Sequence, residues 1–229
     1  EYKKIPEFKL INYNMTLEEF KVIFYWEYIH RLVARSVGLL SIIPLILIYI
    51  KFKRKMSKDF KYLLIFGFIC LQGLLGWFMV KSGLINNSDV SHYRLASHLS
   101  VALIILSLTF LFLLQNLKVN KFNAKINLHF LNLFFLFIVV QIILGAFLAG
   151  LNGGLIYNSW PDMNGNFFPD DITKYDLLSS ETFNNASVVQ FYHRVTAYIL
   201  VVLLAILNFF FYTKKLYSKP ILLLNLSIL

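Results

Sequence analysis

Charge is scarce in this 229-residue sequence, and acidic residues are the scarcer kind, with 12 Asp and Glu against 22 Lys and Arg. Only 15% of the residues are charged, whereas 58% are hydrophobic and 17% are aromatic. A mean hydropathy of +0.65 lies far outside the range of soluble globular domains. The composition therefore excludes an ordinary soluble domain and favours apolar membrane spans joined by short charged loops.

Cysteine is almost absent. The single Cys70 lies inside an apolar run, so no disulfide can form within the chain and cysteine gives no information on the redox compartment. The net charge of +10 would suit a nucleic-acid binder, but the basic residues fall between apolar runs. We therefore expect no nucleic-acid partner and interpret the basic residues as signals of membrane topology.

Apolar runs long enough to cross a membrane cover residues 24–50, 61–80, 94–117, 126–150 and 188–213. A sixth run begins near Pro220 and continues to the last residue, about ten residues into a span that needs roughly 20. Lipid offers the backbone no hydrogen-bond partners, so these runs predict an all-α polytopic transmembrane helical bundle. We expect the chain to be part of a longer protein.

Basic residues are distributed unevenly between alternate loops. The loops around 51–61, 118–125 and 214–219 hold twelve Lys and Arg, whereas those at 81–94 and 151–187 hold three. The positive-inside rule places the basic loops in the cytoplasm. The less basic loops, and the segment 1–23, are then expected on the outer side.

Two short motifs occur twice. Residues 72–78 and 141–147 both read Q-x-x-L-G-x-F near the outer end of a span. Residues 28–34 and 191–197 both carry His-Arg after an aromatic residue, at the start of a span that runs inward. These repeats predict a duplicated helical hairpin, and repeats in membrane folds commonly build sites at their interface.

Three histidines, His30, His98 and His193, each lie a turn or two inside a span that starts at the outer face. At 1.5 Å per residue they are expected roughly 6–10 Å below their helix starts. Equal depth on facing helices suits a buried planar cofactor, and imidazole is a good ligand of heme iron. The alternative is that each ring only hydrogen-bonds a neighbouring helix. We expect structural or interfacial roles for His92 and His129.

Glu27 is the one acid expected within a span, and it lies three residues before His30 on the same helix face. A carboxyl group at such a position is a functional candidate, although an ion pair with Arg31 would also account for it. Arginines at the outer helix ends offer bidentate donors for heme propionates, with interfacial snorkelling as the alternative. These arginines are Arg31, Arg35, Arg94 and Arg194.

Several longer stretches carry a family resemblance. They are Trp26–Arg31, Gly76–Leu84, Val90–Leu99, Gly150–Gly154 with Tyr157–Met163, and Gln190–Arg194. With them the chain resembles heme A synthase of the alphaproteobacterial and mitochondrial type. The resemblance implies eight helices in two four-helix halves, one for the heme O substrate and one for a heme b cofactor.

The same resemblance assigns segments and site residues. It implies an outer loop segment 1–23, three helices of the substrate-heme half in 24–117, and the first helices of the heme b half in 118–229. His30 and His98 correspond to the histidine pair of the substrate half, and His193 to one ligand of heme b. Glu27 corresponds to the acid needed for oxidation. Some members carry a cysteine pair in the first outer loop; residues 1–23 have none.

The implied reaction converts heme O to heme A for cytochrome c oxidase, by oxidising a ring methyl to a formyl group through two hydroxylations and loss of water. Dioxygen supplies the oxygen, and an external donor supplies electrons. The expected surroundings are membrane lipid of a bacterial or mitochondrial inner membrane, with heme O synthase and a second copy of the chain as further candidate partners. Alternatives are a non-enzymatic diheme b-type electron carrier and a transporter with structural histidines.

Overall fold

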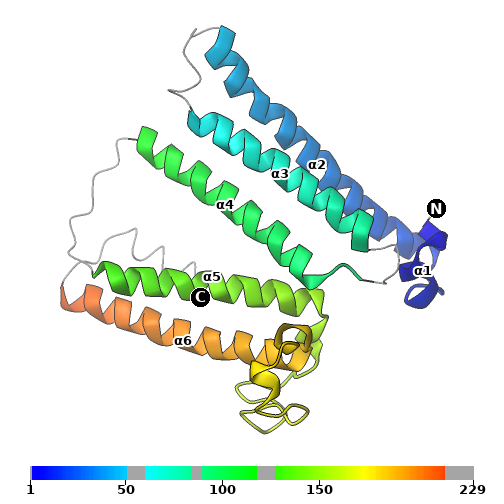
Figure 1. The fold of residues 1–229 in the computed structure, drawn as a ribbon, viewed down its shortest axis with the longest axis vertical. Coiled ribbons are helices and arrows are strands. Elements are labelled where there is room, and N and C mark those ends of the chain that lie inside the picture. The colour runs from blue at the N-terminus through cyan, green and yellow to red at the C-terminus, as the bar shows by residue number, and fades with distance from the viewer. Residues whose placement is uncertain (1, 51–59, 84–88, 118–126, 215–229) are drawn as a thin grey trace. The chain divides into compact units, whose positions relative to one another are not determined.

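The computed structural model of the protein describes residues 2–50, 60–83, 89–117 and 127–214 (Figure 1). Within these ranges, five helices are long and apolar enough to cross a membrane. They are α2 (Leu17–Ile50), α3 (Phe60–Gly83), α4 (His92–Asn116), α5 (Leu128–Gly150) and α6 (Ala186–Thr213). They confirm the predicted all-α polytopic membrane fold. The sixth apolar run and most of the basic loop residues lie outside the described ranges.

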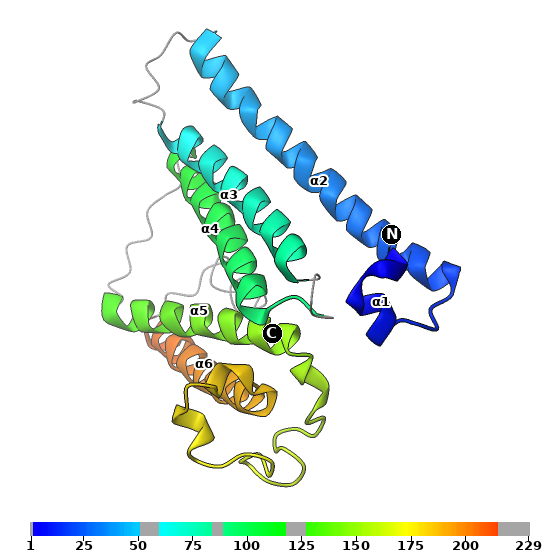
Figure 2. The same ribbon diagram turned by 45° about the vertical axis from the view of Figure 1, so that its right-hand side comes forward.

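The chain divides into two compact units, Glu1–Val119 and Asn120–Leu229. In the first unit α3 packs against both α2 and α4, and in the second α5 packs against α6. In both views of the ribbon, α3 runs beside α4, and α5 runs beside α6 (Figures 1 and 2). Each unit therefore contains a helical hairpin of two neighbouring spans.

The spans expose much of their apolar surface instead of burying it. None of the described side chains of α3 is buried, and Leu74 on that helix is 63% exposed. In the second unit, a small cluster around Leu207 and Phe211 is packed by Phe130, Leu131 and Phe210. Apolar faces of this kind are stable where lipid covers them, so the exposure agrees with helices that a bilayer solvates.

Helix α2 begins at Leu17, seven residues before the apolar run expected from residue 24. A capping box sets this start: the Thr16 backbone N–H donates to the Glu19 carboxylate at 2.8 Å, and the Glu19 N–H donates to the Thr16 hydroxyl at 3.4 Å. A short helix α1 (Pro6–Leu10) precedes it. At about 1.5 Å per residue, the 34 residues of α2 exceed the roughly 30 Å of a bilayer core.

The segment between α5 and α6 is a folded loop, which we call the 151–185 loop. It begins where Asn152 takes a left-handed conformation, with φ of 53°, directly after α5. Gly153 follows, and a Cβ there would meet Leu148 at 2.7 Å and Ala186 at 3.1 Å, so glycine allows the close approach. The loop contains three short 3-10 turns, at Gly153–Leu155, Asp176–Leu178 and Thr182–Asn184.

Candidate functional site

In the second unit, His193 lies on α6 with its ring against α5. A Cβ added to Gly145 of α5 would stand 3.2 Å from His193 Cε1 and 3.8 Å from Nδ1. One turn earlier on α5, the Gln141 side-chain amide nitrogen lies 3.3 Å from His193 Nε2. The His193 ring thus lies against Gly145, which has no side chain, and against the polar side chain of Gln141.

In the first unit, His98 of α4 lies against α3 in the same way. A Cβ added to Gly76 would stand 3.1 Å from His98 Cε1, 3.7 Å from Nδ1 and 3.8 Å from Nε2. Gln72 precedes Gly76 by one turn, as Gln141 precedes Gly145. The Q-x-x-L-G repeat of the sequence therefore marks two helix surfaces that each face a histidine.

The glycine contacts add a second similarity between histidines to the one that the sequence shows. The His-Arg repeat relates His30 to His193, whereas the glycine contacts relate His98 to His193. The folded 151–185 loop lengthens the spacing between glycine and histidine in the second hairpin, so a search at fixed spacing misses the correspondence. The glycines themselves were the available signal, since they belong to a motif that occurs twice.

His30 lies on α2 and His98 on α4, so the first unit contains both of these predicted ligands. The distances of the three histidines from the starts of their helices are not equal. His98 and His193 lie about 9 and 10 Å along their helices, but His30 lies about 20 Å from the start of α2. The reason is the early start of α2, whose capping box adds turns before the apolar run.

Glu27 forms an ion pair with Arg31 one turn along α2, and the two side chains are each about half exposed. The pair that the sequence offered as an alternative therefore exists. It holds the Glu27 carboxylate on the helix face that carries His30, because residues three and four apart are neighbours on a helix. Arg35 follows one turn further along the same helix and is exposed.

The other two predicted arginines have different surroundings. The Arg94 guanidinium lies 5.1 Å from the centre of the Phe78 ring on α3, a cation–π contact. Arg194 instead donates to three backbone carbonyls of the 151–185 loop: Tyr157 at 2.7 Å, Ser159 at 2.8 Å and Asp162 at 2.5 Å. Arg194 thus fastens the loop to α6, a contact that sequence reasoning missed.

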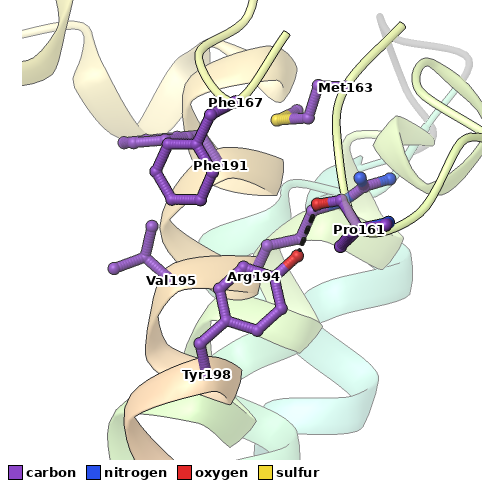
Figure 3. Close-up of a pocket in the computed structure, with 7 residues that line it drawn as sticks. All are labelled: Pro161, Met163, Phe167, Phe191, Arg194, Val195 and Tyr198. Carbon is purple, nitrogen blue, oxygen red and sulfur yellow. Dashed lines mark hydrogen bonds between the residues drawn. The ribbon is translucent and has the colours of Figure 1, made fainter. Parts of the chain in front are cut away.

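Further side chains of α6 hold the same loop. Buried Gln190 accepts a hydrogen bond from the Tyr157 N–H and donates to the Tyr157 carbonyl, at 3.3 and 3.0 Å. Tyr198 donates to the Pro161 carbonyl at 2.7 Å, the bond drawn in Figure 3. Figure 3 also shows the loop residues Pro161, Met163 and Phe167 facing Phe191, Arg194, Val195 and Tyr198 of α6.

Electrostatic contacts order the interior of the loop. The buried Tyr157 hydroxyl lies 2.7 Å from carboxylate oxygens of both Asp170 and Asp171, and burial together with these carboxylates raises the pKa of Tyr157. Hydrogen bonds from the Ser159 side chain and the Gly165 N–H lower the pKa of Asp162. The loop is therefore most stable with a neutral phenol and ionised carboxylates.

The two histidine positions fit a heme ligand. The Nδ1 atoms of His98 and His193 are buried without a hydrogen-bond partner in the described part of the chain, as are the amide oxygens of Gln72 and Gln141. Unpaired buried polar atoms are costly unless they serve a further group. Imidazoles carried on the helices of a bundle are the ligands that heme iron commonly uses.

Comparisons with known proteins agree with this picture. A family model described as cytochrome oxidase assembly protein matches residues 1–229. A heme A synthase of Pelagibacter ubique is 55% identical over all of this chain and 68% of its own length. Heme A synthases of Rickettsia bellii and Wolbachia pipientis are 45% and 40% identical, over 87% and 100% of this chain.

The chain spans 61% of the length of the Rickettsia bellii relative and 65% of the Wolbachia pipientis relative. No solved structure matches it. The resemblance drawn from the sequence motifs is confirmed by a match that runs through every described helix of both units. The chain therefore belongs to the cytochrome oxidase assembly protein family.

Proposed function

We propose that this protein acts as a heme A synthase, which oxidises the ring methyl of heme O to a formyl group and so supplies heme A to cytochrome c oxidase. The observation that carries the proposal is the pair of histidines, His98 and His193, each set against a glycine in a family member whose relatives are heme A synthases. A histidine that only hydrogen-bonds a neighbouring helix does not need a glycine opposite its ring.

His30 and His98 would hold the iron of the heme O substrate in the first unit, which corresponds to the substrate-heme half in 24–117. Both histidines belong to the same compact unit, which supports the pairing. Glu27, one turn before His30, would hold or move a proton beside the reacting methyl group. Positioned carboxylates commonly perform such general acid–base steps.

His193 would hold a heme b cofactor in the second unit, which corresponds to the first helices of the heme b half in 118–229. A bound heme b would relay electrons from an external donor. Arg31, Arg35 and Arg94 are the candidates for contact with propionates. Arg194 shares that prediction, and its guanidinium already binds three loop carbonyls.

The proposed setting is the inner membrane of a bacterium or mitochondrion, where the spans would give the isoprenoid tail of the substrate access from lipid. Heme O synthase is a suitable partner because its product is this substrate. Self-association into a homo-oligomer is a further proposal. The large exposed apolar surface of the spans leaves room for lipid and for protein neighbours.

A complementation experiment tests the function. The full gene product is expressed in a strain that lacks heme A synthase but makes heme O, and extracted hemes are separated by chromatography. We expect heme A with the wild-type protein, and heme O alone with His30→Ala or His98→Ala. His129→Ala at the start of α5 serves as the matched histidine control and should leave heme A formation intact.

A membrane diheme electron carrier would give a different result. It would show a b-type optical spectrum in the purified protein and no heme A in the extracted pool. Heme O alone in the wild-type strain, with the protein present in the membrane, would therefore reject the synthase assignment.

A further inference from the structure

We propose that Gly76 and Gly145 are positioning residues that set the ring planes of the heme-ligating histidines His98 and His193. This inference rests on the proposed heme ligation and concerns what orients the ligands. Neither glycine occupies a turn or a positive-φ position, since both lie inside regular α-helices. Glycine weakens a helix interior, so these two positions need another reason.

The contact distances supply that reason. A Cβ at either position would approach the facing imidazole Cε1 within 3.1 or 3.2 Å, and the ring would have to move by a few tenths of an ångström. Other helical glycines behave differently: a Cβ at Gly38, Gly67 or Gly73 would meet nothing within 4 Å. Among these glycines inside the spans, only the two that face a histidine make a close approach.

The repeated glutamine fixes the other side of the ring in the second unit. The Gln141 amide nitrogen lies 3.3 Å from His193 Nε2. The Gln141 amide oxygen is buried and has no hydrogen-bond partner among the described residues. A glutamine one turn before the glycine recurs as Gln72, whose amide oxygen is likewise buried and unpaired there. Partners of this kind orient metal-bound imidazoles and fix which nitrogen carries the proton.

Steric contact and polar contact together leave the ring little freedom. The glycine sets how closely the imidazole approaches the neighbouring helix, and the glutamine limits its rotation. The plane of a histidine ring that binds heme iron would determine how its orbitals overlap with those of the iron. The electron paramagnetic resonance signal and the midpoint potential of the heme therefore report on ring orientation.

The test uses the full gene product with a graded series at Gly145. Gly145→Ala and then Gly145→Val should shift the largest g value and the midpoint potential of the b-type heme progressively, with heme content falling severalfold for valine. Alanine is the best helix former, so the first variant keeps α5 helical. Gly73→Ala, on α3 with open space around it, is the control and should leave all these quantities unchanged.

A second measurement does not depend on bound heme. The rate at which diethyl pyrocarbonate modifies His193, read by mass spectrometry after heme extraction, should rise at least threefold in Gly145→Val because the ring is displaced from α5. An unchanged rate and an unchanged resonance signal in both variants would overturn the positioning role. Absence of any heme from the wild-type protein would instead reject the proposed function, while the modification rates would still decide on the glycine.

Discussion

Replacement of Arg194 by leucine tests whether this residue fastens the 151–185 loop or serves a heme propionate. The guanidinium donates to the carbonyls of Tyr157, Ser159 and Asp162 from a half-buried position. Two of these carbonyls keep another donor in the variant, since Gln190 donates to the Tyr157 carbonyl and the Ser159 hydroxyl donates to the Asp162 carbonyl. Of the three carbonyls, only that of Ser159 is left without any hydrogen-bond donor that the structure shows.

The magnitude follows from this count. Hydrogen bonds to a charged group each contribute about 1.5–3 kcal/mol, and the two substitute donors offset part of the loss, so we expect the loop to lose about 2–4 kcal/mol of local stability. Since 1.4 kcal/mol is a factor of ten, local opening should become about 30- to 1,000-fold more frequent. Arg194→Lys should fall between wild type and leucine, because one ammonium nitrogen cannot reproduce the planar fork.

Hydrogen exchange of loop peptides, measured by mass spectrometry in nanodiscs, reads this opening directly. Arg31→Leu is the matched control from the other His-Arg repeat: its ion pair with Glu27 lies within α2, so loop exchange should stay at the wild-type rate. Exchange within twofold of wild type in Arg194→Leu would refute the reasoning. A change in the heme spectrum with unchanged loop exchange would point to the propionate role instead.

Further predictions concern the site, the topology and the loop. Glu27→Gln should keep the fold and bound heme but lower heme A formation about 100-fold or more, as loss of a positioned proton donor does; normal heme A in extracted pools would reduce Glu27 to an ion-pair partner. His193→Ala should remove the low-spin b-type absorbance of the purified protein, and an unchanged spectrum would contradict its ligand role. A periplasmic reporter should be active when fused within 151–187 and inactive within 51–60, and the reverse would invert the assigned orientation. The pKa of Tyr157 is raised in the folded loop, so the stability it contributes is complete below the ordinary tyrosine value of about 10 and is lost as pH rises above it; loop exchange that stays flat up to pH 11 would contradict this.

The long apolar runs allowed the spans to be predicted closely. Four of the five expected runs match a helix to within three residues at either end, while α2 begins seven residues before the expected position 24. That difference arises from a local signal, the capping box of Thr16 and Glu19, which lies in a polar stretch where hydropathy gives no guidance. A second missed signal was Asn164-Gly165, where both residues have positive φ and form the tight turn between Met163 and Asn166.

Contacts between distant segments could not be predicted from spacing. Nothing in the sequence indicates that Arg194 would donate to three backbone carbonyls of a loop more than thirty residues earlier. Nor does it indicate that Gln190 would bind both the backbone N–H and the backbone carbonyl of Tyr157. The Arg of a His-Arg motif near a heme ligand suggests a propionate contact equally well. The choice depends on how the loop folds back over α6, which is a property of the packed unit.

The sequence by itself determined that this protein is a membrane-spanning helical protein with histidines on several spans, because apolar run length and the cost of unpaired backbone in lipid leave few other solutions. Its motifs were also enough to indicate the family. Only the tertiary structure decided what faces two of these histidines. The sequence marks Gly76 and Gly145 only as members of a repeated motif, whereas helix packing brings each so close to an imidazole ring that an added Cβ would stand 3.1 or 3.2 Å from it.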